Sequence, residues 1–133
     1  MILGTLIRTC TGLNWSAVFL SDKCSDPFND KCIRASRGCS HKIPLIYNQN
    51  VKQLISYLEK EKWNTFIADV KGKPFTSVTI PAKTALVLGS EAHGVSSVLQ
   101  SISKATQVTI PLNDNVESLN VATAGAILMN HFK

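Results

Sequence analysis

The alternation of short β-type runs with helical patterns is the feature that most constrains how this chain folds. Runs rich in Val, Ile, Leu and Thr alternate with segments whose apolar residues recur at helical spacing. Parallel strands need a covering helix between them, so the alternation predicts an α/β fold whose parallel sheet is covered on both faces. Strands are expected at 15–20, 43–46, 65–70, 85–88 and 107–110, helices at 4–12, 51–60, 95–102 and 119–132, and connections at 21–30 and 71–83.

Two polar loops follow the last two expected strands. The first loop breaks its strand at Gly89 and places Glu91 just beyond it. The second loop carries Ser118 and Asn120 directly before an Ala-rich apolar run. Open α/β sheets bind their ligands at the carboxyl ends of the strands, so both loops are candidates for a binding site. Neither has the glycine pattern of a phosphate-binding loop or a dinucleotide fingerprint, which disfavours a Rossmann-like small-molecule enzyme.

Ser118 and Asn120 also have a purely structural interpretation. A Ser or Asn side chain before an apolar helix accepts hydrogen bonds from the free backbone N–H groups of the first turn. Either residue fits this role at the start of the last expected helix. The spacing alone leaves capping and ligand binding open.

Composition bounds the size of the protein and the nature of its partners. With 133 residues and 44% hydrophobic content, the chain is long enough for one domain with a single core. The net charge of +5 suits a polyanionic partner such as RNA, although charge alone does not identify one. The basic segment with Arg34, Arg37, His41 and Lys42 is either a solvated helix face or a surface that follows an RNA backbone.

The cysteines and the hydrophobic runs argue against several other classes. Cys10, Cys24, Cys32 and Cys39 lack the close C-x-x-C spacing of a zinc site, so no metal is expected. No apolar run approaches the roughly 20 residues that cross a bilayer. We therefore expect a cytosolic protein with reduced thiols and no membrane partner.

Taken together, the two loops carry a resemblance to a known family. Gly-Ser-Glu-Ala-His-Gly at 89–94, followed by Ile-Pro-Leu-Asn-Asp-Asn-Val-Glu-Ser-Leu-Asn-Val-Ala at 110–122, resembles the SpoU-type (TrmH-like) RNA 2′-O-ribose methyltransferases of the SPOUT superfamily. Leu-Gly-Thr-Leu-Ile-Arg-Thr at 3–9 is similar to the first motif of that family, and the stretch 32–38 followed by 42–45 resembles its middle region. The resemblance therefore covers nearly the whole chain.

One position departs from the family pattern. Ile2 stands where the first motif normally has Asn, and the strand that should precede this motif is absent. We therefore expect residues 1–133 to form one SpoU-type methyltransferase domain, truncated at its N-terminus.

The resemblance implies a particular architecture. It predicts a three-layer parallel-sheet fold with a deep C-terminal trefoil knot, in which the segment 110–132 passes through the loop after Leu88. It also predicts a homodimer whose knots pack against each other, with the apolar helix face at 122–129 as a suitable contact surface.

The resemblance also implies a reaction and a cofactor. The reaction is methyl transfer from S-adenosyl-L-methionine to a ribose 2′-hydroxyl of tRNA or rRNA. Backbone groups at Gly89, Ile110 and Leu119 would contact the cofactor, with Leu88 and Leu112 as apolar neighbours. The apolar residues fit a role in core packing at the same time, because a backbone contact leaves the side chain free to pack.

Arg8 corresponds to the catalytic arginine of the family. A guanidinium stays protonated, which favours stabilisation of a developing alkoxide and positioning of an RNA phosphate over proton abstraction. Ser118 and Asn120 match the polar pair beside the methyl group, and Glu91 matches the acid of the second motif. The alternative from a different class is a catalytically inactive knotted RNA-binding module, which Ile2 in place of Asn favours.

Overall fold

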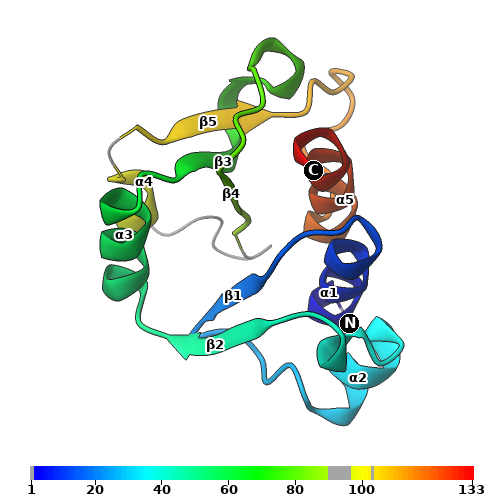
Figure 1. Ribbon diagram of the computed structural model, residues 1–133. Coiled ribbons are helices and arrows are strands. Elements are labelled where there is room, and N and C mark those ends of the chain that lie inside the picture. The colour runs from blue at the N-terminus through cyan, green and yellow to red at the C-terminus, as the bar shows by residue number, and fades with distance from the viewer. Residues whose placement is uncertain (1, 90–96, 103) are drawn as a thin grey trace.

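A computed structural model describes residues 2–89, 97–102 and 104–133. Within these ranges the chain alternates between helices and strands (Figure 1). The elements in order are α1 (Ile2–Gly12), β1 (Val18–Ser21), α2 (Asp30–Ser36), the short 3₁₀ helix η1 (Cys39–His41), β2 (Leu45–Gln49), α3 (Val51–Lys60), β3 (Asn64–Pro74), the 3₁₀ helix η2 (Phe75–Ser77), β4 (Thr84–Val87), α4 (Ser97–Gln100), β5 (Thr106–Thr109) and α5 (Val121–Phe132).

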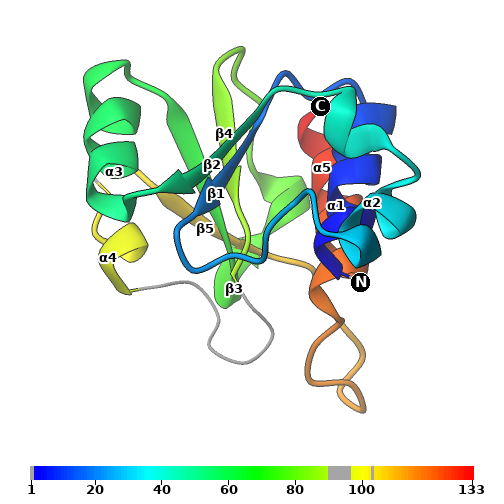
Figure 2. The ribbon, with the colours of Figure 1, turned by 90° about the horizontal axis from the view of Figure 1, so that it is seen from below.

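Every strand pair of the described residues is parallel, which confirms the predicted α/β class. The pairing divides the strands into two groups, β1 with β2, and β3 between β4 and β5. Helices α3 and α4 lie on one side of the strands, and α1, α2 and α5 lie on the other (Figures 1 and 2). The arrangement is therefore helix, strand, helix in three layers.

The predicted strand at 15–20 was wrong at its start, because β1 begins only at Val18. Asn14 takes a left-handed conformation with φ 63°, and the backbone N–H of Trp15 donates to the Cys10 carbonyl. These residues close the end of α1 and are unavailable for a strand. The indole Nε1 of Trp15 donates instead to the Met129 carbonyl at 3.2 Å, which fixes the α1 end to α5.

The predicted connection at 71–83 was also wrong at its start, because β3 continues to Pro74. The pairing of β3 with β5 is interrupted after Ala68 and resumes with Lys73 opposite Val108. The interruption is a bulge, held by the Asp69 side chain, which accepts the Lys71 N–H at 2.9 Å. The Gly and Pro signals of this stretch mark the bulge and the strand end rather than an open loop.

The described part of the chain contains two clusters of buried core residues. One contains Phe66, Val108, Leu128 and Phe132, with the rings of Phe66 and Phe132 stacked at 4.5 Å. The other, beneath α1 and α2, contains Ile7, Cys32 and Ile43. Trp15 packs against both clusters and joins them.

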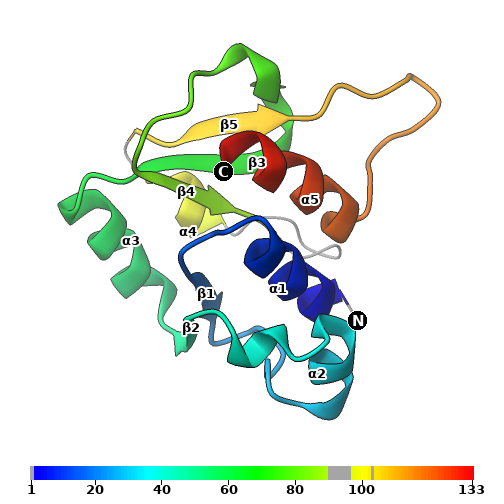
Figure 3. The ribbon, with the colours of Figure 1, turned by 45° about the vertical axis from the view of Figure 1, so that its right-hand side comes forward.

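Helix α1 lies between α2 and α5 (Figure 3). A glycine permits close approach at each crossing. A Cβ on Gly4 would lie 2.6 Å from the Ala35 Cβ of α2, and one on Gly125 of α5 would lie 2.7 Å from the Leu6 side chain. These crossings fix the position of α1, and with it the exposed Arg8.

Candidate functional site

The loop 110–120 joins β5 to α5 and protrudes from the body of the molecule (Figures 2 and 3). Its tip is ordered by its own turn, in which the Asn113 side chain accepts the Asn115 N–H at 2.9 Å. Ser118 is exposed, whereas Leu112 and Leu119 are half-buried. The backbone groups of Leu112 and Leu119 form no hydrogen bond with another described residue. Both residues therefore have backbone donors and acceptors that no other described residue uses, beside half-buried apolar side chains.

Asn120 caps α5. Its backbone is extended, and its side-chain oxygen accepts the Thr123 N–H at 2.8 Å. The structure thus confirms the capping interpretation for Asn120 rather than for Ser118. The same contact fixes the direction of the Asn120 side chain at the mouth of the loop, so capping and a role in the site are compatible.

Substitution of Asn120 tests its capping role through the stability of the protein. We expect Asn120→Ala to lower the free energy of unfolding by about 1 kcal/mol, because a first-turn N–H loses its acceptor. Asn120→Asp keeps the acceptor and should leave stability within a few tenths of a kcal/mol of wild type. Urea denaturation measures both effects. Equal destabilisation by the two variants would contradict the capping role.

The loop after β4 begins with Leu88 and Gly89, which are both half-buried. The Leu88 side chain packs against the cluster around Phe66 and approaches Gly125 of α5. Ile110 packs against the same cluster. The core role foreseen for these apolar residues is therefore present, and their backbone remains at the carboxyl ends of β4 and β5. Glu91 lies outside the described residues.

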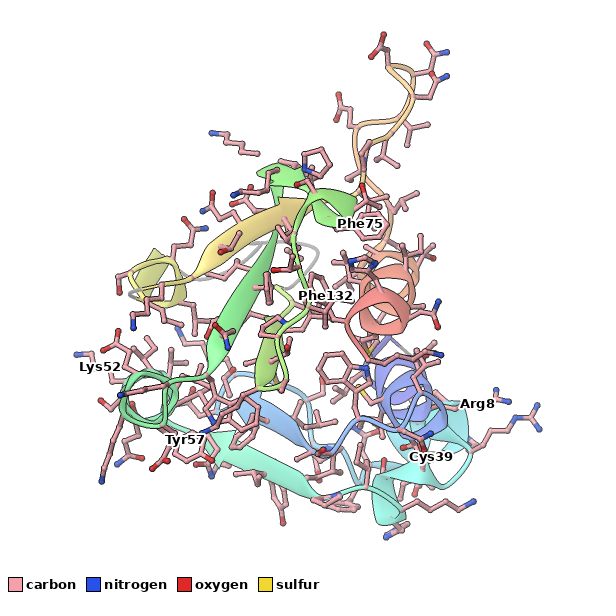
Figure 4. All side chains as sticks on the ribbon, turned by 45° about the horizontal axis from the view of Figure 1, so that its top comes forward. Arg8, Cys39, Lys52, Tyr57, Phe75 and Phe132 are labelled. Atoms are coloured by element: carbon pink, nitrogen blue, oxygen red, sulfur yellow. The ribbon has the colours of Figure 1, made fainter. Side chains whose placement is uncertain are left out.

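Arg8 is exposed on α1. Its side chain points away from the molecule and is well separated from the tip of the protruding loop (Figure 4). Arg8 lies off the face of α1 that buries Gly4 and Ile7. The structure does not bring the guanidinium together with the tip of that loop within one chain.

The basic segment lies at the end of α2 and around η1. Arg34 occupies the last turn of α2, Arg37 caps it in a left-handed conformation with φ 52°, and Lys42 follows η1. All three side chains are exposed. They form a continuous positive stretch of chain that is free to contact a polyanion.

A feature missed by the sequence reasoning lies at the carboxyl ends of β1 and β2. It is a cavity of about 370 Å³ between the ends of these strands and the loop that leads to α2. The available signal was the Asp-Pro-Phe segment at 26–28 in the loop that follows the first strand, since ligands bind at strand carboxyl ends. The lining residues are Leu20, Ser21, Asp22, Cys24, Ser25, Asp26, Pro27, Phe28, Tyr47 and Asn48.

The four cysteines are free thiols. Burial raises the pKa of Cys10 to about 11, and its Sγ lies 3.2 Å from the Met129 sulfur. Burial also raises the pKa of Cys32. Over the described ranges, no three His, Cys, Asp or Glu side chains gather as a metal site would require, and no helix there is long and apolar enough to cross a membrane.

The fold and the two loops indicate the class of protein to which the chain belongs. The protein is a parallel α/β domain with loops at the carboxyl ends of β4 and β5, the two strands that flank β3, and the second loop leads into a capped helix. The chain belongs to the SpoU rRNA Methylase family, which it matches over residues 3–130.

Individual relatives agree with this assignment. The chain is 33% identical to the 23S rRNA (guanosine(2553)-2′-O)-methyltransferase RlmP of Bacillus subtilis (strain 168), over 98% of this chain and 52% of that protein. It superposes on the structure of a protein from Porphyromonas gingivalis that is assigned to the TrmH family of RNA methyltransferases. The TM-score is 0.87 and the identity 31%, and the match covers 99% of this chain and 54% of that one. An AdoMet-bound rRNA methyltransferase from Sinorhizobium meliloti gives TM-score 0.89 and 26% identity, covering 96% and 49%. The chain thus spans about half the length of these relatives.

Proposed function

We propose that the protein transfers a methyl group from S-adenosyl-L-methionine to a ribose 2′-hydroxyl of tRNA or rRNA. The observation that carries the proposal is the pair of loops after β4 and β5 in a chain of the SpoU family. Relatives named as rRNA methyltransferases, and a similar structure with AdoMet bound, support the same reaction. The free thiols fit a reducing compartment such as the cytosol.

The cofactor would lie against the two loops. Leu112 and Leu119 offer backbone hydrogen-bonding groups that no described residue uses, beside half-buried apolar side chains. A polar, backbone-lined and partly apolar surface suits a ligand with an adenine ring and an amino-acid end. Gly89 and Ile110 would add backbone contacts, and Leu88 an apolar one. The bound cofactor supplies an activated methyl group.

The remaining residues act on the RNA. Ser118 and Asn120 orient the ribose by hydrogen bonds, and the Asn120 side chain is held in place by its bond to the Thr123 N–H. Arg8 stabilises the negative charge that develops on the 2′-oxygen and positions a neighbouring phosphate. Arg34, Arg37 and Lys42 follow the RNA backbone, where neutralised phosphates release their counterions. Glu91 ties the first loop or contacts the partner subunit.

In this proposal, Arg8 and Ser118 come together in one site only when Arg8 is supplied by a second subunit. Arg8 points away from its own molecule, so it serves the site of a partner in a homodimer. Ile2 on α1 and Ile127 on α5 are exposed apolar residues, with exposed fractions of 36% and 37%, on the two helices that would meet at the contact. The segment 110–132 passes through the loop after Leu88 as a trefoil knot.

Calorimetric titration with S-adenosyl-L-methionine tests the cofactor assignment. We expect saturable binding of about one equivalent per chain, and binding of the demethylated product at the same loops. Circular dichroism before the titration establishes that the sample is folded. A folded sample that binds neither compound would remove the methyltransferase proposal.

A catalytically inactive RNA-binding module is the second candidate. Ile2 at the start of α1, in place of the Asn of the family pattern, favours it. This candidate predicts RNA binding without methyl transfer, including in the dimer. Restoring Asn at position 2 should then be required for any activity.

A further inference from the structure

The cavity between β1, β2 and the loop before α2 has one aromatic wall. Tyr47 is 48% exposed, and its ring meets the Phe28 ring edge to face at 5.6 Å between centroids. An exposed aromatic face that a neighbouring ring holds in place is a stacking platform for an unpaired nucleobase. The volume of about 370 Å³ is enough for one base.

The lining of the cavity also includes a fixed carboxylate. Asp26 Oδ1 accepts the Phe28 N–H at 2.9 Å, which sets the orientation of the group and leaves Oδ2 without a described partner. Pro27 is fully buried, and its carbonyl accepts the Ser40 hydroxyl at 3.0 Å. The carboxylate therefore stands beside an anchored segment, because Pro27 and Phe28, the two residues that follow it, are held by contacts with the rest of the fold.

The cavity is continuous with the basic segment. The Phe28 ring also contacts the His41 ring, with 5.2 Å between centroids. His41 lies between the exposed Arg37 and Lys42, so an RNA backbone that follows the basic segment passes beside the cavity. The positive charges there offset the repulsion between the Asp26 carboxylate and the phosphates.

The chemistry of the carboxylate selects among the bases. A carboxylate only accepts hydrogen bonds. Guanine presents two adjacent donors, N1–H and N2–H, on its Watson–Crick edge, whereas each other base offers a single donor group beside an acceptor. Two parallel hydrogen bonds to Asp26 are therefore possible only for guanine.

We propose that this cavity binds an unpaired guanine of the RNA, stacked on Tyr47 and hydrogen-bonded to Asp26. The proposal rests on the proposed RNA-binding function and specifies one feature of the substrate. It does not depend on methyl transfer, because an inactive RNA-binding module would use the same cavity.

Single-stranded RNA hexamers test the proposal. We expect a uridine hexamer with one central guanine to bind about tenfold more tightly than the same hexamer with adenine, cytosine or uracil at that position. Fluorescence anisotropy at a fixed salt concentration measures the four affinities. Asp26→Asn keeps the Phe28 N–H bond through its amide oxygen but replaces an acceptor with a donor, so the guanine preference should disappear.

Asp30→Asn is the matched control, because it removes the same charge from an exposed residue in the first turn of α2 that does not line the cavity. It should retain the guanine preference, whereas Tyr47→Ala should weaken all four hexamers. A wild-type chain that binds the four hexamers equally, or not at all, would overturn the proposal. So would a preference that survives in Asp26→Asn or is lost equally in Asp30→Asn. The cofactor titration is independent of these results and decides the methyltransferase assignment separately.

Discussion

Arg8→Ala should lower the rate of methyl transfer at saturating RNA by about a hundredfold, or roughly 2.7 kcal/mol of transition-state stabilisation. Cofactor affinity should stay nearly unchanged, because in this proposal Arg8 acts on the RNA and the cofactor contacts are made by the loops after β4 and β5. Single-turnover transfer of labelled methyl groups measures the rate, and calorimetry measures cofactor affinity. Both effects follow if the guanidinium acts only on charge that develops in the transition state.

Arg34→Ala is the matched control for the loss of a positive charge. Arg34 is equally exposed but lies on α2 in the basic segment. Its loss should weaken RNA binding and reduce the salt dependence, with turnover at saturation unchanged. If Arg8→Ala behaves in the same way as Arg34→Ala, Arg8 is a phosphate contact and the catalytic assignment is wrong.

The same variant tests the shared site. A chain with Arg8→Ala and a chain with Asn120→Ala each lack one half of the proposed site. If Arg8 serves the partner's loops, mixing the two inactive chains creates heterodimers with one intact site, and part of the activity returns. Activity that does not return, in a sample shown to exchange subunits, would place Arg8 in the site of its own chain.

Gly4→Ala should lower the free energy of unfolding by about 1–3 kcal/mol, although alanine is the better helix former. The added Cβ would lie 2.6 Å from both the Ala35 Cβ and the Cys32 carbonyl oxygen of α2. Neither neighbour is the end of a flexible side chain, so the two helices must move apart. Urea denaturation followed by circular dichroism measures the loss.

Gly12→Ala is the control for this substitution. Gly12 ends α1, and a Cβ there would meet nothing within 4 Å. Its stability should equal or exceed that of wild type, by up to about 1 kcal/mol. Comparable destabilisation at both positions would show that packing against α2 is not the cause.

The sequence predicted the fold class because strand and helix periodicities agree along most of the chain. The misplaced boundaries arise where tertiary contacts override local pattern. The local pattern predicts that Trp15 starts a strand, but its indole donates a hydrogen bond to the Met129 carbonyl, 114 residues away in the chain. Likewise Lys73 reads as part of a Gly- and Pro-containing loop, but it pairs with Val108 after the bulge.

Only part of the candidate site could be predicted from the sequence. Asn120 was predicted as one of two candidate caps, with Ser118, because capping depends on residues only three positions apart. The aromatic cavity escaped notice because Phe28 and Tyr47 are distant in sequence and meet only through the pairing of β1 with β2. No local pattern encodes such a meeting. The roles of Arg8, Ser118 and the cofactor loops stay predictions.

The two-cluster core has a consequence for how the protein unfolds. Trp15 packs against the cluster around Phe66 and also against the one around Ile7, and its indole ties α1 to α5. Cooperative unfolding requires that the loss of one cluster destabilise the other. In this chain the Trp15 side chain is one direct link between the two clusters. In a variant that lacks the second tryptophan, Trp63, the fluorescence of Trp15 therefore reports the moment at which the two clusters separate.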